Sequence, residues 1–329
     1  MSYAQGGLIE AADYNGFVGS SPSSTANTIN TVWAVGNGNA GYGQTALAQV
    51  SQAGLVTATQ WASAVNTLNT IRTHQTGSGT GIGAPTAGAL VSYLSSFSGG
   101  VSSAYSSRLS YNSSGTTTND SNHADNPNSA NGIAAQTFTI TRTATFASAD
   151  QARYFFNAGG RISFIIGSST NGGGTTRGAD LVTLASTNFV SYTAFASASG
   201  GGKSGTGGTV NTNSTSIGYY NLTTSFQTLA KITSTTSPYT GDYIQLDVKS
   251  NGVQGSNADV GTIVTFQLTL YSAAQSTFPA PPANPPGTGS TTTNTTTEDA
   301  INITVNNYLS VIYPETTNLT NSWGTVTLA

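Results

Sequence analysis

The chain has 329 residues and a formal net charge of -3, and only 6% of its residues are charged. Soluble domains usually carry about 25% charged residues, so we expect a neutral surface made of serine, threonine, asparagine and the 39 glycines. The nine lysines and arginines are scattered singly, which excludes the basic stripe that nucleic-acid binding needs.

Cysteine is absent, so the chain has neither a disulfide framework nor a thiolate metal site. The stretch from Met1 to Gly7 lacks the basic and apolar segments of a signal peptide, and no run of about 18 apolar residues occurs. We therefore expect neither secretion by that route nor membrane insertion. Low charge without cysteine suits a protein that is made in a cytoplasm and acts outside a cell, as virion parts released by lysis and some adhesins do.

Residues 1–111 predict an N-terminal helical docking region. An Asn-Gly pair at residues 15–16 predicts a turn, and residues 25–33 predict a short helix. Residues 36–43 contain too much glycine for regular structure, and we expect a docking loop there. Because this loop lacks the lysine and following hydroxyl residue of a phosphate-binding loop, no nucleotide site is expected.

The clearest helix is predicted from about Thr57 to His74. Thr57 or Thr59 suits its N-terminal cap, and Gly77 predicts its end. Apolar residues at spacings of four, three and three form one stripe along it: Trp61, Val65, Leu68 and Ile71. This stripe is either ordinary core or a seam between chains, and the second interpretation makes these residues the candidate assembly site.

A second helix is predicted from Pro85 to Phe97, because proline suits a first turn and the pair Gly99-Gly100 predicts an end. Beyond it, residues 112–132 contain almost no large apolar side chain and predict a linker. Oxygen and nitrogen donors gather in this linker, at Asp120, Asn122, His123 and Asp125. Their spacing matches no calcium loop, so we expect a solvated loop and no metal site.

Residues 133–275 predict a β-sandwich domain. Residues 136–146 alternate apolar and threonine side chains with a period of two, as a half-buried strand does. Aromatic residues before Gly159-Gly160, and the apolar residues after them, predict a hairpin. Further strands are predicted at residues 181–195, 217–232, 242–248 and 260–271. Together they indicate a mainly β fold, an antiparallel β-sandwich of which the jelly roll is one form.

Glycine-rich loops at residues 171–178 and 199–208 are expected at the tips of the sandwich, where loops can carry recognition.

Residues 276–298 are rich in proline and threonine and predict a second linker. Residues 299–329 predict a short C-terminal β segment, which is too small to fold alone and should add to another surface or chain. Limited proteolysis is expected to cut first in the two linkers.

Two stretches resemble structural proteins of tailed bacteriophages, in particular tail-fibre-like and other appendage proteins. They are the run from Ala152 to Gly160, whose centre is Arg-Tyr-Phe-Phe-Asn, and the predicted helix around Trp61 to Gln75. The resemblance implies a virion protein of the tail, neck or baseplate. It implies other virion proteins and host surface glycans as partners. The helix stripe and the small C-terminal segment both need partners, so we also expect a homo-oligomer, with a trimer favoured.

The leading hypothesis is thus a non-enzymatic virion structural protein that attaches by its N-terminal region and presents a β domain for host adsorption or contacts between subunits. A carbohydrate-binding module or adhesin is the alternative. A polysaccharide depolymerase is disfavoured, because glutamates are few and unpaired and only His74 and His123 could serve a Ser-His-Asp site. We expect no catalytic residues, no cofactor and no metal.

Overall fold

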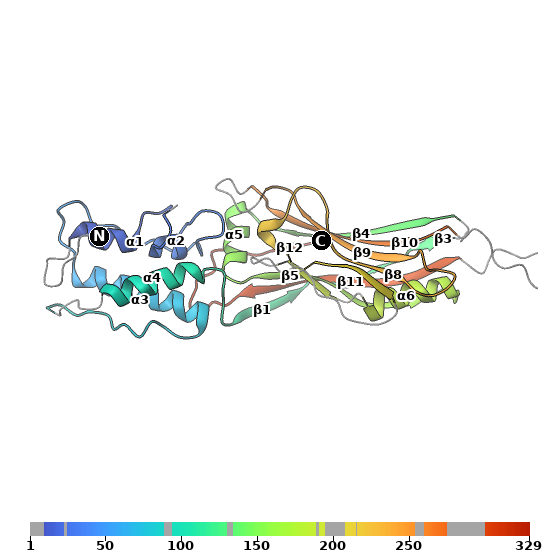
Figure 1. Cartoon of the computed structure of the whole chain (residues 1–329), viewed down its shortest axis with the longest axis horizontal. Helices are drawn as coiled ribbons and strands as arrows, with labels where there is room; N and C mark the ends of the chain where they lie inside the picture. Colours follow the sequence, from blue (N-terminus) through green and yellow to red (C-terminus); the bar gives the residue numbers. More distant parts are fainter. Residues whose placement is uncertain are drawn as a thin grey trace, which may run out of the picture.

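The computed structural model describes residues 10–22, 25–88, 94–129, 134–188, 191–194, 208–214, 216–253, 260–274 and 300–329. The molecule is elongated, with a helical region at one end and a β-sandwich at the other (Figure 1). Both sheets of the sandwich are antiparallel, which confirms the predicted mainly β fold with an N-terminal helical region. No helix among the described residues is long and apolar enough to cross a membrane.

The helical region contains four described helices: α1 (Ala11–Val18), α2 (Ile29–Trp33), α3 (Ala58–Thr76) and α4 (Leu94–Ser106). Helix α3 confirms the clearest sequence prediction. The Thr57 hydroxyl accepts a hydrogen bond from the Gln60 amide, and the Gln60 side chain accepts one from the Thr57 amide. Such a reciprocal cap satisfies amide groups that a helix start leaves free. Gly77 ends the helix in a left-handed conformation, as glycine commonly does.

The apolar stripe of α3 is the core of the helical region. Its four residues are at most 3% exposed. Helices α1 and α4 cover it, since the Trp61 ring lies 5.5 Å from the Tyr14 ring and 5.6 Å from the Phe97 ring. The burial of the stripe within one chain supports the interpretation as ordinary core, and the assembly role of Trp61, Val65, Leu68 and Ile71 stays a prediction.

Two details of the helical region differ from prediction. The Asn-Gly pair lies inside α1 and forms no turn. The Asn15 side chain donates a hydrogen bond to the Val50 carbonyl and accepts one from the Val50 amide, so it ties α1 to a distant segment. Helix α4 runs through Gly99-Gly100, where the sequence predicts the end of a helix, and Pro85, its predicted start, is not helical. A Cβ at Gly100 would lie 3.1 Å from the Leu68 side chain, so glycine there permits close packing of α3 and α4.

The first sheet has the strand order β1-β11-β5-β6, with β2 and β3 also pairing with β11. Its strands are β1 (Ser114–Asn119), β2 (His123–Asp125), β3 (Asn128–Ser129), β5 (Arg161–Asn171), β6 (Ser191–Ala194) and β11 (Ile301–Pro314). The predicted linker 112–132 thus consists largely of strands. Sequence reasoning missed them because their exposed hydroxyl side chains carry no apolar signal, and backbone hydrogen bonds to β11 hold them.

The second sheet has the order β12-β4-β10-β9-β8-β7. Its strands are β4 (Gln136–Thr145), β7 (Gly208–Asn213), β8 (Gln227–Ser234), β9 (Tyr243–Ser250), β10 (Ile263–Ser272) and β12 (Thr327–Leu328). In β10, alternate residues from Val264 to Leu270 face the core, as the period of two predicts. Phe266 of this strand meets Phe164 of β5 across the two sheets, with ring centroids 6.3 Å apart.

The C-terminal segment belongs to the sandwich of its own chain. Strand β11 lies between β1 and β5 in the first sheet, and β12 pairs with β4 in the second. The sequence predicts that residues 299–329 add to another surface or another chain, and the structure shows the first of these, because the sandwich of the same chain supplies the surface. The second predicted linker, residues 276–298, lies outside the described residues.

Two predicted strands are helices, α5 (Ala149–Asn157) and α6 (Thr176–Asn188). In α5 the Ser148 hydroxyl caps the first turn by accepting the Gln151 amide hydrogen. The helix lies between the helical region and the sandwich and is buried from Ala152 to Asn157. A short 3-10 turn, η1 (Tyr219–Asn221), precedes β8.

The strands found in residues 114–125 change the proteolysis prediction. We expect these residues to resist brief digestion by thermolysin, because their backbone groups are held in the sheet by β11. Mass spectrometry of the first fragments checks this. An early cut between residues 114 and 125 in the folded protein would contradict the observed pairing.

Candidate functional site

The two regions of the molecule are joined around Arg153 of α5, a residue 3% exposed. Its Nη1 donates hydrogen bonds to the backbone carbonyl oxygens of Gly36, Gly38 and Ala40, at 2.7, 3.2 and 2.8 Å. Its Nη2 donates to Asp150 at 3.1 Å. A guanidinium presents several donors in one plane, so a single side chain can hold the whole loop.

Neighbouring residues of α5 tighten this contact. The Asn157 amide donates to the carbonyl oxygen of Gly41 at 2.9 Å, and its oxygen accepts from the Tyr220 hydroxyl. Gly43 has φ +69°, and a Cβ there would lie 2.4 Å from the Tyr154 ring. The predicted docking loop, residues 36–43, is thus packed against α5 of its own chain.

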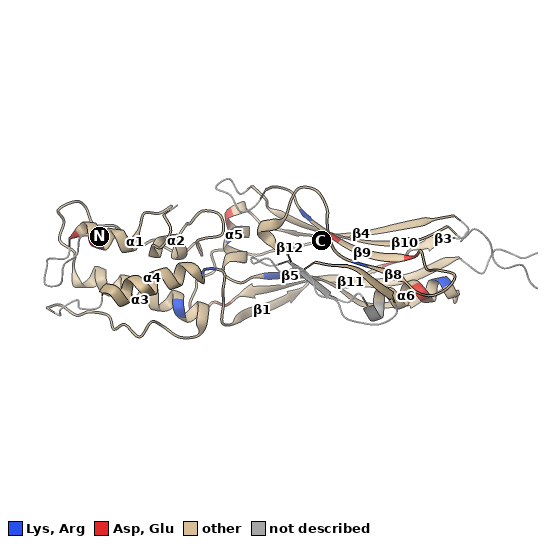
Figure 2. Cartoon of the chain, in the orientation of Figure 1, with Lys and Arg blue, Asp and Glu red and all other residues tan. Residues whose placement is uncertain are grey.

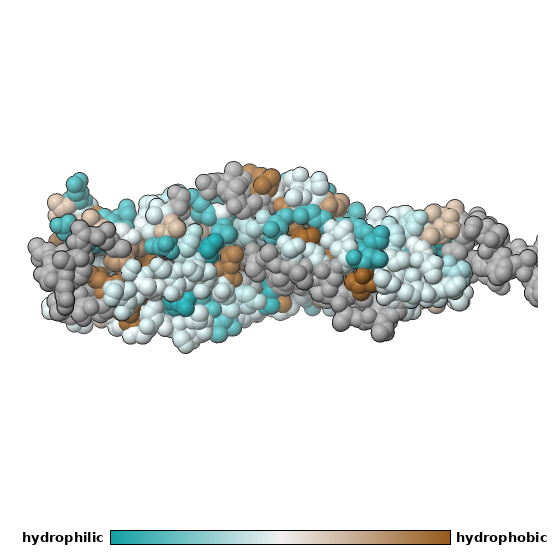
Figure 3. Space-filling view, viewed as in Figure 1, coloured by the Kyte–Doolittle hydropathy of each residue, from teal (hydrophilic) through white to brown (hydrophobic). Residues whose placement is uncertain are grey.

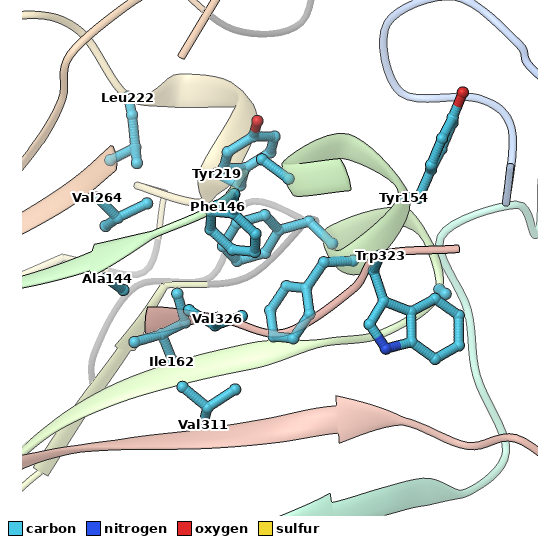
Figure 4. Packing of buried hydrophobic residues seen from close by; sticks show 14 of the residues in the cluster. Ala144, Phe146, Tyr154, Ile162, Tyr219, Leu222, Val264, Val311, Trp323 and Val326 are labelled. Carbon is cyan, nitrogen blue, oxygen red and sulfur yellow. The ribbon is translucent and has the colours of Figure 1, made fainter. Parts of the chain in front are cut away.

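Aromatic side chains continue the joint into the sandwich core. Phe146, Tyr219 and Trp323 gather around α5 (Figure 4). The ring of Phe156 stacks on Tyr219 with centroids 4.0 Å apart, and Phe155 meets Phe146 at 5.2 Å. This cluster fixes α5, and with it Arg153, against both sheets.

A second contact between the regions is the buried pair of His74 in α3 and Glu315 after β11, whose Nδ1 and Oε1 are 2.8 Å apart. The other Glu315 oxygen accepts the backbone amides of Thr317 and Asn318. Burial lowers the pKa of His74 below its ordinary value of 6.5, against a smaller opposing effect of Glu315. Burial acts to raise the pKa of Glu315, but its hydrogen bonds together hold that pKa below 4.5. The pair is therefore a neutral imidazole donating its Nδ1 hydrogen to a carboxylate.

The pair predicts a stability that depends on pH. The folded protein keeps His74 neutral, so the unfolded chain binds that proton more readily, and stability should fall as the pH drops below about 6.5. Glu315 adds a further loss below about 4.5, since its folded pKa is also lowered. Urea unfolding at pH 7.5 and 5.5 measures the first loss. His74→Gln should be less stable at pH 7.5 and lose less between the two values, and an unchanged loss in this variant would contradict the assignment.

A groove of about 530 Å³ opens beside this pair. Its walls are the start of β1, the end of β11 and the C-terminal segment that follows β11. The lining residues are mostly small and hydroxylic: Ser113, Ser114, Gly115, Thr116, Thr118, Tyr313, Pro314, Glu315, Thr316, Thr317, Asn321, Trp323, Gly324 and Thr325. Of these residues, Trp323 is 1% exposed.

Hydroxyl groups dominate the chemistry of this groove. Its one ionised lining residue, Glu315, has both carboxylate oxygens engaged by His74, Thr317 and Asn318. Thr118 is paired with Val311 across the sheet, so the two side chains share a face, and Val311 is fully buried in the core. The groove is therefore an uncovered part of the core-facing side of the first sheet.

The donors of the predicted solvated loop lie in β2 and the turn before it. The His123 ring nitrogen Nε2 is 2.8 Å from an Asp120 oxygen, whereas Asp125 pairs with Arg142 of β4 and accepts from the Asn307 amide. Within the described residues, no group of three or more histidine, aspartate or glutamate side chains could hold a metal ion. Of the two recognition loops, residues 171–178 end β5 and begin α6, and most of residues 199–208 lie outside the described part.

Another buried charged cluster closes the far end of the sandwich. Arg177 and Asp242 are both fully buried, with Nε and Oδ2 3.6 Å apart, and Arg177 donates to the Ala273 carbonyl. Asp242 also accepts from the Ser272 hydroxyl at 2.7 Å and the Ala273 amide at 2.8 Å. Burial raises the pKa of Asp242. The cluster ties α6 to β9 and β10 and is structural.

Sequence reasoning singled out the segment around Arg153 but not its role, because its partners lie more than 110 residues away in the chain. It also missed the groove, whose walls come from residues 113–118 and 313–325. The sequence signal that could have found the groove is the hydroxyl-rich composition shared by residues 113–118 and 313–325. No protein-family model matches the chain, and neither a curated protein nor a solved structure matches it.

Proposed function

We propose that the chain is a non-enzymatic structural protein of a tailed-bacteriophage particle, an appendage subunit of the tail, neck or baseplate. Its helical region attaches to the particle, and its sandwich serves host adsorption or contacts between subunits. The observation that carries the proposal is the joint at Arg153. It builds two regions into one elongated body, and its residues are those of the stretch that resembles phage proteins.

The joint suits an appendage because it fixes the orientation of one region relative to the other. Arg153, Asn157 and the His74–Glu315 pair all connect the regions through buried hydrogen bonds. Buried polar contacts of this kind are costly to break singly. A part that holds its outer end at a set distance from the particle needs such stiffness.

The surface supports the same proposal. Charged residues are few and widely separated along the molecule (Figure 2), and most of the visible surface has hydropathy near the middle of the scale (Figure 3). Neutral hydroxyl surfaces serve both sugar contact and hydrated interfaces between subunits. The proposed partners are copies of the same chain, with a trimer favoured, and other virion proteins. With the α3 stripe buried, the outer face of the second sheet is where such partners would meet.

This outer face is polar and half exposed. Threonines of β4 from Thr137 to Thr143 lie in register with alternate residues of β10 from Thr265 to Tyr271. The stacked rings of Tyr243 and Tyr271, 4.7 Å apart, lie on the same face. A flat face of this kind can meet another subunit through hydrogen bonds and bridging water.

The test is the composition of purified phage particles. Mass spectrometry of gradient-purified particles should find the chain in a fixed ratio to the known structural proteins, and antibodies against it should label one place on the particle in electron micrographs. Light scattering of the purified chain tests the oligomer. Absence from particles would overturn the proposal, and a monomer that also fails to bind particles lacking it would do the same.

A further inference from the structure

We propose that the groove between β1 and the C-terminal segment binds an uncharged oligosaccharide. The inference deepens the proposed function, on which it rests for the source of the sugar, namely the surface of the host cell. Its volume of about 530 Å³ lies within the roughly 300–1,000 Å³ of small-molecule sites. The chemistry of its walls selects the class of ligand.

Hydroxyl side chains line both walls. Thr116 and Thr118 stand on one wall, and Thr317 and Thr325 belong to the other. Each hydroxyl can donate one hydrogen bond and accept others, which matches the mixed donor and acceptor character of sugar hydroxyls. Asn321 adds an amide to the same wall. Most of these side chains are exposed to solvent, so a ligand in the groove can reach them without any rearrangement of the core.

Charge argues against the other ligand classes. No lysine or arginine is among the lining residues, and the neighbouring guanidinium of Arg161 is engaged by the Ser114 hydroxyl, so an anionic sugar or a phosphate is disfavoured. The carboxylate of Glu315 is engaged by His74 and by backbone amides, so it offers no free oxygen to a cation. Apolar lining is limited to parts of Tyr313, Pro314 and Trp323, which is too little for a lipid chain.

The geometry also favours a sugar over a peptide strand. A peptide that adds to a sheet pairs with the backbone of an edge strand and lies beside it. Here the groove lies on the face of β1, because Thr118 shares the face of Val311. A ligand in the groove therefore meets side-chain hydroxyls together with the half-buried Tyr313. Hydroxyl groups beside an aromatic ring suit the polar rim and apolar ring face of a pyranose.

The experiment is a titration of the purified full chain with neutral trisaccharides of glucose, mannose, galactose and N-acetylglucosamine, monitored by saturation-transfer NMR. Trigalacturonic acid serves as the anionic comparison. At least one neutral trisaccharide should bind, and Thr118→Val or Thr325→Val should weaken it roughly 2- to 10-fold, the effect of one lost hydrogen bond. These substitutions keep the side-chain shape and remove only the hydroxyl.

Thr117→Val is the matched control, because Thr117 is an exposed threonine of the same strand that does not line the groove. It should leave affinity unchanged. The proposal is overturned if no neutral trisaccharide binds at about 10 mM, if only the anionic sugar binds, or if Thr117→Val weakens binding as much as Thr118→Val. Particle composition tests the proposed function separately, so either can fail while the other stands.

Discussion

Arg153→Met should lower the free energy of unfolding by about 3–5 kcal/mol. The guanidinium is the donor for the carbonyl oxygens of Gly36, Gly38 and Ala40 in a buried place. Methionine fills similar space but donates nothing, so these oxygens would stay buried without that donor. Urea unfolding followed by circular dichroism measures the loss, and hydrogen exchange should show residues 36–43 opening first.

Arg72→Met is the matched control for this substitution. Arg72 is half-buried on α3, where it donates to Gln75 and to the carbonyl of Ser103. We expect its loss to cost less than about 1 kcal/mol, as for most exposed polar contacts. Arg153→Lys should fall between the two, because an ammonium group cannot span the same set of carbonyls. Equal effects of Arg153→Met and Arg72→Met would show that the loop is held by something else.

Leu68→Asp should unfold the helical region, with a cost of more than about 4 kcal/mol. Leu68 is fully buried in the middle of α3 and lies against Gly100 of α4. The substitution leaves a cavity and places a carboxylate at a fully buried position of the apolar core. We expect loss of the cooperative transition and of the fluorescence of buried Trp61.

Asn66→Asp introduces the same charge two residues away on the exposed side of α3, and it should change stability by no more than about 0.5 kcal/mol. Leu68→Ala distinguishes the two interpretations of the α3 stripe, a core within one chain and a contact between chains. If Leu68 belongs to the internal core, Leu68→Ala should lower the free energy of unfolding by about 2–5 kcal/mol and leave the mass measured by light scattering unchanged. If Leu68→Ala instead dissociated an oligomer at unchanged stability, the stripe would be a contact between chains after all.

Sequence reasoning succeeded where the signal was local. Helix α3 has its cap, its stripe and its terminating glycine within 21 residues, from Thr57 to Gly77. Strand β10 shows its alternation because one face is buried and the other is half exposed. Each of these elements has one side toward the core and the other toward solvent. The spacing of apolar residues in the sequence is therefore enough to predict which side is buried.

It failed where burial or exposure was uniform. The aromatic half of α5 is enclosed on all sides, so its Tyr-Phe-Phe run reads as a strand, although the Ser148 cap was present in the sequence. Strand β1 is exposed along almost its whole length and reads as a linker. The groove could not be predicted, because its two walls come together only when β11 pairs with β1.

The central place of β11 also sets the order in which the protein can fold. Its partners β1 and β5 are synthesised well over a hundred residues earlier, with β4 and most of the second sheet made in between. Until residues 301–314 leave the ribosome, β1 and β2 have no strand to pair with, and one edge of β5 stays open. Such distant pairings close slowly, and an open edge can capture a neighbouring nascent chain. In a cell that makes many copies at once, the time before β11 is available is the stage most exposed to misassembly, and a chaperone would act there.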